Sequence, residues 1–395
     1  MKQELRRENA RIALRMSDIQ PFHVMELLAR ARTLEAQGRS IVHMEIGEPD
    51  FPSPQPVIDA GIEALKRGDL HYTPATGLPQ LREAIAGFYM QRHGLRVSPS
   101  RIVVTPGASG ALLLALGVLI NPGDKVLMSD PGYPCNRHFV RLLEGMPAGI
   151  GTDAATGYQL TDELIAKNWD PETIAVMIAS PANPTGMLVS RDHLSAIVEI
   201  THALKGRLIV DEIYHGLVYE NESTTALSLS DEVFVINSFS KYFGMTGWRL
   251  GWLVAPEAYA READKLAQNV FLAASTPAQY AALAAFTPET LSILEERRVE
   301  FRLRRDYLLP ALRNLGFVIQ ATAQGAFYLY ADCNRFSADS ETFSRELLER
   351  AGVAVTPGID FGSHQAARHV RFAYTTSLEN LREGVRRLDA FLCKS

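Results

Sequence analysis

Residues 233–252 carry the stretch around which the chain is organised, VFVINSFSKYFGMTGWRLGW. Its first four residues are apolar, which is typical of a strand buried on both faces of a sheet. Two serines and a lysine follow at once, and Arg249 stands just before a second apolar run. This cluster suits a covalently held, phosphorylated aldehyde cofactor, because an amine condenses with an aldehyde and hydroxyl and guanidinium groups bind phosphate.

Lys241 is the candidate nucleophile of this stretch. A lysine at the protein surface is the ordinary alternative, but Lys241 is flanked by Phe239, Tyr242 and Phe243. If these neighbours remove water from the amine, its preference for the charged form falls and it becomes reactive near neutral pH.

Short apolar runs alternate with helical patterns through the middle of the chain. The runs lie at residues 102–104, 125–128, 174–178, 207–210, 233–236 and 250–254. Runs that are apolar on both faces indicate a sheet covered by helices on both sides. The sequence therefore predicts an α/β fold.

The two ends of the chain have a different texture. A helix is predicted at 21–38, a strand at 41–46 and a proline-rich loop at 47–54, whereas a long charged helix at 288–315 leads to alternating segments at 325–330 and 369–373 and helices at 340–351 and 378–392. We expect the proline-rich loop to divide two units and the long helix to lead to a second unit at 316–395. The arginines of the long helix have helical spacing, which favours a solvated face: Arg297, Arg298, Arg302, Arg304 and Arg305.

Composition argues against several partners. The net charge of −5 and pI near 6.1 give no electrostatic reason to expect nucleic acid or an anionic membrane. Cys135, Cys333 and Cys393 are too widely separated for a disulfide framework or a metal site, and no apolar run reaches the ~18 residues of a spanning helix. The expectation is a cytoplasmic protein without a metal.

Three further polar groups follow predicted strands. The turn from Gly107 to Gly110 offers backbone amides at a helix start, which suits phosphate, although a tight connection with small residues explains it equally. Asp211 ends a buried run and needs a cationic partner or several donors, which any arginine would provide. Asn183 lies in a loop fixed by Pro181, Pro184 and Gly186, an ordinary turn when taken alone.

The order of these residues is more specific than any one of them. The series from Gly47-Glu48-Pro49-Asp50 through Asn-Pro-Thr-Gly (183–186), Ser-Phe-Ser-Lys (238–241) and Gly-Trp-Arg-Leu-Gly (247–251) to Val370-Arg371 resembles the class I aminotransferases, which are fold-type-I pyridoxal-phosphate enzymes. The resemblance covers nearly the whole chain. It implies a three-layer large domain around a mostly parallel sheet at 47–290 and a smaller α+β domain formed by both chain ends, at 1–46 and 291–395. It also implies ping-pong transfer of an α-amino group from an L-amino acid to a 2-oxo acid.

The resemblance also implies a role for each matched residue. Lys241 forms the Schiff base with pyridoxal phosphate and moves the α-proton, while Asp211 faces the pyridine nitrogen. Asn183 and Tyr214 bind the phenolic oxygen, and Tyr133 stacks on the ring. The phosphate is bound by Ala108, Ser109, Ser238 and Arg249, and by Tyr72 of the other subunit, which predicts a homodimer. Arg371, with Gly47 and Asn183, binds the substrate.

The preferred amino acid is harder to infer. Relatives that favour aspartate often carry a lysine in the phosphate turn or an arginine in a partner loop, whereas this chain has Ser109 and no lysine or arginine at 269–286. We expect a neutral or aromatic amino acid, with Tyr328 and Phe327 lining the side-chain pocket. The alternatives are an aspartate aminotransferase, a carbon–sulfur lyase or acyltransferase of the same fold, and a cofactor-binding regulatory domain, for which no helix-turn-helix precedes this stretch.

Overall fold

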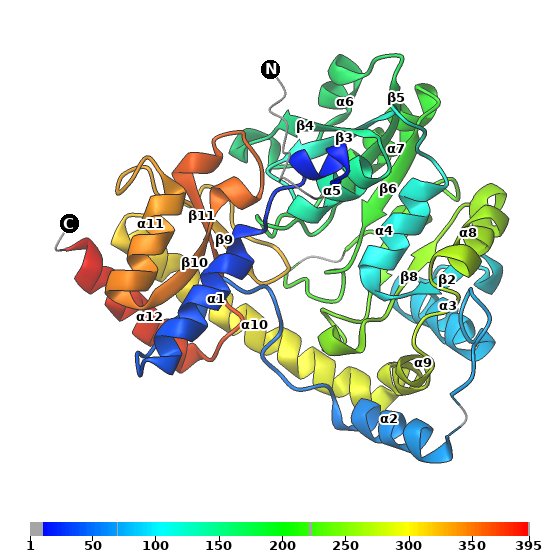
Figure 1. The fold of residues 1–395 in the computed structure, drawn as a ribbon, viewed down its shortest axis with the longest axis horizontal. Coiled ribbons are helices and arrows are strands. Elements are labelled where there is room, and N and C mark those ends of the chain that lie inside the picture. Colours follow the sequence, from blue (N-terminus) through cyan, green and yellow to red (C-terminus); the bar gives the residue numbers. More distant parts are fainter. Residues whose placement is uncertain (1–10, 69, 221–222, 394–395) are drawn as a thin grey trace.

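The computed structural model describes residues 11–68, 70–220 and 223–393. Two sheets organise the chain (Figure 1). The larger has seven strands in the order β2-β8-β7-β6-β5-β3-β4. Its bounds are β2 Ile102–Thr105, β3 Lys125–Asp130, β4 Met146–Gly151, β5 Thr173–Ala179, β6 Arg207–Asp211, β7 Phe234–Ser238 and β8 Gly251–Val254. Only β8 runs antiparallel to its neighbours in this sheet, which is therefore mostly parallel, as predicted.

Alternate residues of these strands enter two separate cores. Val126 and Met128 pack with one set of helices, and Leu127 packs with the other. This period of two is what a sheet covered on both faces requires. The covering helices are α3 Pro79–His93, α4 Gly107–Gly117, α5 Pro134–Leu142, α6 Asp162–Asn168, α7 Arg191–Ala203 and α8 Glu257–Val270.

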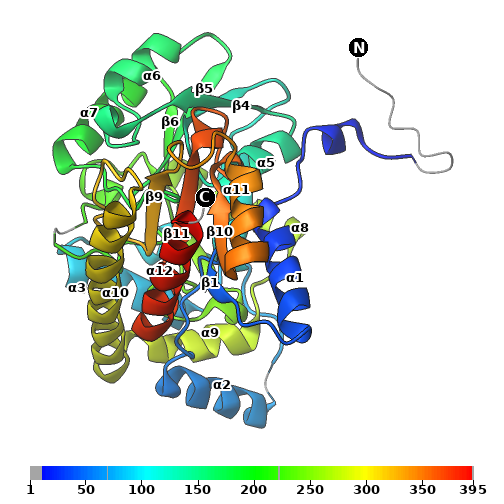
Figure 2. The ribbon, with the colours of Figure 1, turned by 90° about the vertical axis from the view of Figure 1, so that its left-hand side faces the viewer.

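The second sheet joins the two ends of the chain, in the order β1-β10-β11-β9. It comprises β1 Val42–Met44, β9 Tyr328–Asp332, β10 Val353–Pro357 and β11 His369–Ala373. Strand β1 pairs in parallel with β10, and Figure 2 shows α1 (His23–Ala36) lying beside this sheet with α11 (Ser340–Glu346) and α12 (Leu378–Leu392). The α/β class with a smaller unit built from both chain ends is confirmed, while the domain boundaries at 46 and 290 stay a prediction.

The remaining helices are α2 Gln55–Arg67, α9 Thr276–Leu283 and α10 Pro288–Leu315. Helix α10 has the bounds that its sequence pattern predicted. Its N-cap residue is Thr287, whose side chain accepts from the Thr290 amide, and its C-cap residue is Gly316, with a positive φ of 100°. It runs from α2 and α9 to the small sheet (Figure 1), so it links the two sheets.

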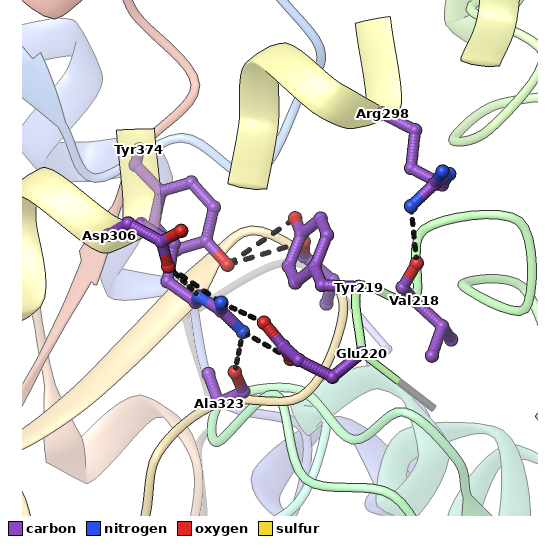
Figure 3. A network of polar contacts seen from close by, with 9 residues as sticks. Val218, Tyr219, Glu220, Arg298, Asp306, Ala323 and Tyr374 are labelled. Atoms are coloured by element: carbon purple, nitrogen blue, oxygen red, sulfur yellow. Dashed lines mark hydrogen bonds and ion pairs between the residues drawn. The ribbon is translucent and has the colours of Figure 1, made fainter. Parts of the chain in front are cut away.

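The prediction of a solvated arginine face on α10 was wrong for two of its five residues. Arg304 and Arg305 are each 4% exposed, because both reach groups outside the helix. Arg304 donates to Asp50 at 2.7 Å, and Arg305 binds Glu220 and the Ala323 carbonyl. Figure 3 shows the contacts around Glu220, Asp306 and Ala323, where the hydroxyl of Tyr374 also approaches Tyr219. Arg304 therefore ties α10 to the loop that follows β1, and Arg305 ties it to the loops that follow β6 and precede β9.

Two element boundaries also differ from prediction. Helix α4 starts at Gly107 and so includes the predicted turn from Gly107 to Gly110, because the left-handed φ of 71° at Gly107 turns the chain directly from β2 into the helix. Strand β9 starts at Tyr328 rather than Gly325, since Ala326 has a φ of 57° and interrupts the extended pattern before it. Within the described residues, no helix is long and apolar enough to cross a membrane.

Candidate active site

A cavity of about 430 Å³ opens beside the carboxyl ends of β5, β6 and β7, where the strands of a parallel sheet place ligand groups. Its lining includes ten of the residues predicted as site residues from the sequence: Gly47, Ala108, Ser109, Tyr133, Asn183, Asp211, Tyr214, Ser238, Lys241 and Arg249. Arg371 of β11 lies there as well. The cavity thus brings together predicted groups that are as far apart in the sequence as Gly47 and Arg371.

Lys241 enters the cavity from the turn that follows β7. Its Nζ donates to the Gly47 carbonyl at 2.8 Å and lies 5.9 Å from the centre of the Phe327 ring. Burial of this amine lowers its pKa to about 8, against weaker opposing effects of nearby carboxylates. A substantial fraction of Lys241 is therefore an uncharged nucleophile at mildly alkaline pH.

Asp211 is the last residue of β6 and is almost fully buried. Its Oδ1 accepts from the Ile213 amide at 3.1 Å. Burial raises the pKa of this carboxyl to about 6, partly offset by the Ile213 amide and the charge of Lys241. A buried carboxylate is stabilised by a cationic partner, such as a protonated ring nitrogen or an ammonium group, because the partner's charge compensates for the hydration that burial removes.

The first turn of α4 and Arg249 form a cradle at one end of the cavity. The amides of Ala108 and Ser109 lie in that first turn, where a helix offers no backbone acceptors of its own. A Cβ at Gly107 would stand 2.7 Å from Nη2 of Arg249, and one at Gly251 would stand 2.8 Å from the Ala108 nitrogen. Glycine at both positions therefore lets the arginine and the helix start approach each other, in an arrangement suited to an anion.

Ser238 is the serine of this cradle, and its hydroxyl has protein partners. It donates to the Leu250 carbonyl at 3.2 Å and accepts from the Ser240 amide at 3.0 Å. The second lone pair of the hydroxyl oxygen and its rotation leave room for a further contact on the cavity side.

Arg371 closes the opposite end and is only 3% exposed. Its Nη1 donates to Oδ1 of Asn183 at 2.9 Å, and its Nη2 donates to the Glu45 carbonyl and to Oγ1 of Thr356. The guanidinium carbon lies 4.3 Å from the centre of the Tyr328 ring. Its buried Nε has no hydrogen-bond partner in the described part of the chain, so the planar fork retains one unsatisfied donor.

Three tyrosines stand between these ends. The hydroxyls of Tyr214 and Tyr328 lie 2.9 Å apart, and burial raises the pKa of Tyr214 well above its ordinary value. Burial likewise raises the pKa of Tyr133, which lines the cavity at the start of α5. Burial also raises the pKa of Tyr328, so all three hydroxyls stay protonated, and in the Tyr214–Tyr328 pair one hydroxyl donates and the other accepts.

Two predicted residues lie elsewhere. Tyr72 does not line the cavity of its own chain and is 84% exposed. Phe327 was expected to line the side-chain pocket, and this was wrong. It is fully buried, and its ring packs on Tyr214 at 5.4 Å and on Phe301 at 5.5 Å, because it lies in the turn before β9, where Ala326 has a positive φ, and not in the strand with Tyr328.

Sequence reasoning missed the contribution of α1 to the cavity. This helix and its N-cap residue supply Phe22, Val24, Met25, Leu28 and Arg32. The helical spacing of the apolar residues had indicated only that one face is covered. What it covers depends on the pairing of β1 with β10, which the sequence pattern of α1 does not specify.

Comparison with known proteins agrees with this geometry. Residues 39–388 match the family described as aminotransferase class I and II. The chain belongs to this family. The valine–pyruvate aminotransferase of Mycobacterium tuberculosis is 39% identical, with 97% of this chain and 98% of that protein covered. The aspartate aminotransferase of Thermotoga maritima is 34% identical, with 96% and 99% covered.

Solved structures agree as well. The crystal structure of an aminotransferase from Mycobacterium tuberculosis matches with a TM-score of 0.94 and 38% identity, covering 98% of this chain and 100% of that one. Class I aminotransferases depend on pyridoxal phosphate, so the chain is a pyridoxal-phosphate-dependent aminotransferase with amino acid and 2-oxo acid substrates.

The residues of the cavity fit this cofactor. It requires an amine for its aldehyde, an acid for its ring nitrogen and donors for its phosphate. Lys241 is an amine with a lowered pKa, Asp211 is a buried carboxyl, and the cradle of Arg249 and α4 offers a guanidinium with free amides. The glycines at 107 and 251 are part of this fit, because a side chain there would displace the cradle.

Proposed function

We propose that this aminotransferase uses neutral or aromatic L-amino acids in preference to aspartate. The observation that carries the proposal is the composition of the cavity beside Arg371. Val24, Met25 and Leu28 of α1 line it together with the ring of Tyr328. The short side chain of aspartate would place its second carboxylate among these apolar groups, which is costly without a paired cation.

Two positions that often carry a cation in aspartate-favouring relatives support the same preference. Ser109 occupies the α4 position at which aspartate-favouring relatives often carry a lysine, and residues 269–286 contain neither lysine nor arginine. The aspartate aminotransferase of Thermotoga maritima is itself a relative, so the aspartate-selective activity is the alternative that the experiment must separate.

We assign the chemistry to the residues of the cavity at the strand ends of the seven-stranded sheet. When bound, pyridoxal phosphate supplies an aldehyde for the substrate amine and a ring that accepts electrons. Lys241 holds the cofactor through Nζ and, once released, takes the proton from the substrate α-carbon. With the cofactor bound, Asp211 would keep a proton on the ring nitrogen, and Asn183 and Tyr214 would donate to the phenolic oxygen. Tyr133 would orient the ring by stacking on it.

The groups at the two ends orient the reactants. The phosphate is held by the amides of Ala108 and Ser109, by Ser238 and by Arg249. Arg371 binds the substrate α-carboxylate, for which its unsatisfied Nε is available, with Asn183 and the Gly47 backbone beside it. Because Gly47 and Arg371 join the small sheet to this cavity, substrate binding also excludes water from Lys241.

We further propose a homodimer in which Tyr72 completes the phosphate site of the partner subunit. Its exposure and its place outside the lining of its own chain's cavity support this role. Sedimentation analysis that returned a monomer at working concentration would contradict it. The free state of Cys135, Cys333 and Cys393 is compatible with work in the cytoplasm.

Steady-state comparison of amino donors tests the preference. We expect kcat/KM for alanine, valine or phenylalanine to exceed that for aspartate by at least about tenfold, which corresponds to about 1.4 kcal/mol. A tenfold advantage for aspartate would overturn the proposal. Single half-reactions distinguish the reaction type: in ping-pong transamination the amino acid alone changes the cofactor spectrum and yields its 2-oxo acid, whereas a lyase also releases ammonia.

A further inference from the structure

Helix α1 carries two arginines that are two positions apart and are used differently. Arg30 forms an ion pair with Glu349, with Nε 2.5 Å from Oε1 and Nη2 3.0 Å from Oε2. Arg32 lines the cavity, and it forms no hydrogen bond or ion pair with the described residues. One guanidinium therefore fastens the helix to α11 and its following turn, and the other remains free at the cavity.

The face of α1 that lines the cavity changes from apolar to cationic along the helix. Val24, Leu28 and Arg32 recur every four residues, which places them in a stripe on one side of the helix. At a rise of ~1.5 Å per residue, Arg32 lies about 12 Å along the axis from Val24. The stripe is thus apolar near its start and cationic at its far end.

The start of α1 is the end that lies close to Arg371. Both carboxylate oxygens of Asp360 accept backbone amides at this start, from His23 and Val24, each at 2.9 Å. The next residue, Phe361, has its ring centre 4.9 Å from the guanidinium carbon of Arg371. This fixes the direction of the stripe, from the group that binds the α-carboxylate toward Arg32.

The other cations of the cavity already have partners or neighbours that define their use. Lys241 donates to Gly47, and Arg371 donates to Asn183 and Thr356. Arg249 donates to the Thr246 carbonyl and lies against Gly107. Among the described lining residues, Arg32 is the arginine left without such a contact.

We propose that Arg32 binds the distal carboxylate of one of the two substrates, a dicarboxylic 2-oxo acid with a longer chain than the oxo acid of aspartate. This inference rests on the proposed function, in which Arg371 takes the α-carboxylate. The aliphatic part of such a substrate lies along Val24 and Leu28, and its far carboxylate reaches the planar fork of Arg32. The same stripe accepts a neutral side chain in the other half-reaction and leaves the short carboxylate of aspartate among apolar groups.

The test compares Arg32→Gln with the matched control Arg30→Gln in the holoenzyme. Both variants remove one positive charge from the same helix. With a neutral donor held constant, the measured quantity is the ratio of kcat/KM for 2-oxoglutarate to kcat/KM for pyruvate. We expect this ratio to fall at least tenfold in Arg32→Gln and to change by less than twofold in Arg30→Gln. A ratio within twofold of wild type in Arg32→Gln would overturn the proposal.

Charge reversal and an unreactive probe complete the design. Arg32→Glu must lower the ratio further than Arg32→Gln, because it replaces attraction by repulsion. Calorimetric titration with glutarate and with butyrate reports binding without turnover, and we expect glutarate to lose affinity in Arg32→Gln relative to butyrate. A wild-type protein that binds glutarate through Arg32 but fails to transaminate neutral amino acids would refute the proposed function and leave this inference standing.

Discussion

The cavity has two halves that were built in different ways. The floor lies where strands of the seven-stranded sheet end, and it consists of Lys241, Asp211, Asn183, Ser238 and the start of α4. The wall consists of α1, Gly47, Tyr328 and Arg371, which come from segments at both ends of the chain. Short turns position the floor, whereas contacts between distant segments position the wall, as when Asp360 binds amides 337 and 336 positions away. Chemistry is therefore fixed locally and substrate selection is fixed by tertiary assembly.

The largest effect is expected for the floor, in Lys241→Ala. We predict that transamination falls by about a thousandfold or more, because the variant loses both the covalent anchor and the base for the α-proton. The absorbance of the covalently held cofactor should disappear as well. Rate measurements and absorption spectra at saturating pyridoxal phosphate check both results.

Lys265→Ala is the matched control for this variant. Lys265 lies on α8, is paired with Glu262 and does not line the cavity. It should keep the spectrum and the rate of wild type, and circular dichroism should show both variants folded. Full activity in Lys241→Ala would show that Lys241 is neither the anchor of the cofactor nor the base.

The same contrast explains what the sequence could predict. Lys241, Asp211 and Asn183 follow apolar runs directly, and strand ends of a parallel sheet meet at one edge, so their assembly followed from local pattern. The two-sheet fold and the bounds of α10 followed in the same way. Arg32, Val24 and Met25 were missed because an amphipathic helix shows that it is covered but not by what. Phe327 and Tyr328 were assigned together, although Phe327 lies in the turn before β9 and not in the strand with Tyr328.

A smaller effect is expected behind the floor, at Glu212. This carboxyl is fully buried, and its Oε1 accepts from Thr225 Oγ1 at 3.1 Å and from the Ala226 amide at 2.8 Å. Burial raises its pKa from 4.5 to about 8, so the native state keeps a proton that the unfolded chain releases at lower pH. Wild-type stability should therefore decline as pH rises from about 4.5 to 8.

Glu212→Gln isolates this contribution, because the amide keeps an acceptor oxygen and does not ionise. We predict that the free energy of unfolding of Glu212→Gln minus that of wild type is about 1 to 3 kcal/mol larger at pH 8 than at pH 5. Urea unfolding of both proteins at each pH measures the difference, which cancels other titrating groups. A difference that stayed constant over this range would show that Glu212 is ionised in the fold and that the floor tolerates a buried charge.

The smallest effect is expected at the wall, in Asp360→Ala. The N-cap residue of α1, Phe22, offers no side-chain acceptor, so Asp360 replaces the missing cap from the opposite end of the chain. Loss of this cap should lower the free energy of unfolding by about 1 kcal/mol. Because α1 lines the cavity, KM for bulky neutral donors should also rise several-fold, with a smaller change in kcat.

Asp339→Ala is the control that removes a helix cap at a place away from the cavity. Asp339 caps α11 through the Glu341 amide at 3.1 Å and does not line the cavity. It should lose a similar stability without the rise in KM for bulky donors, since α11 carries no lining residue. Equal kinetic changes in the two variants would mean that α1 responds to global stability alone. A rise in KM confined to Asp360→Ala would instead show that substrate selection depends on one contact between the two ends of the chain.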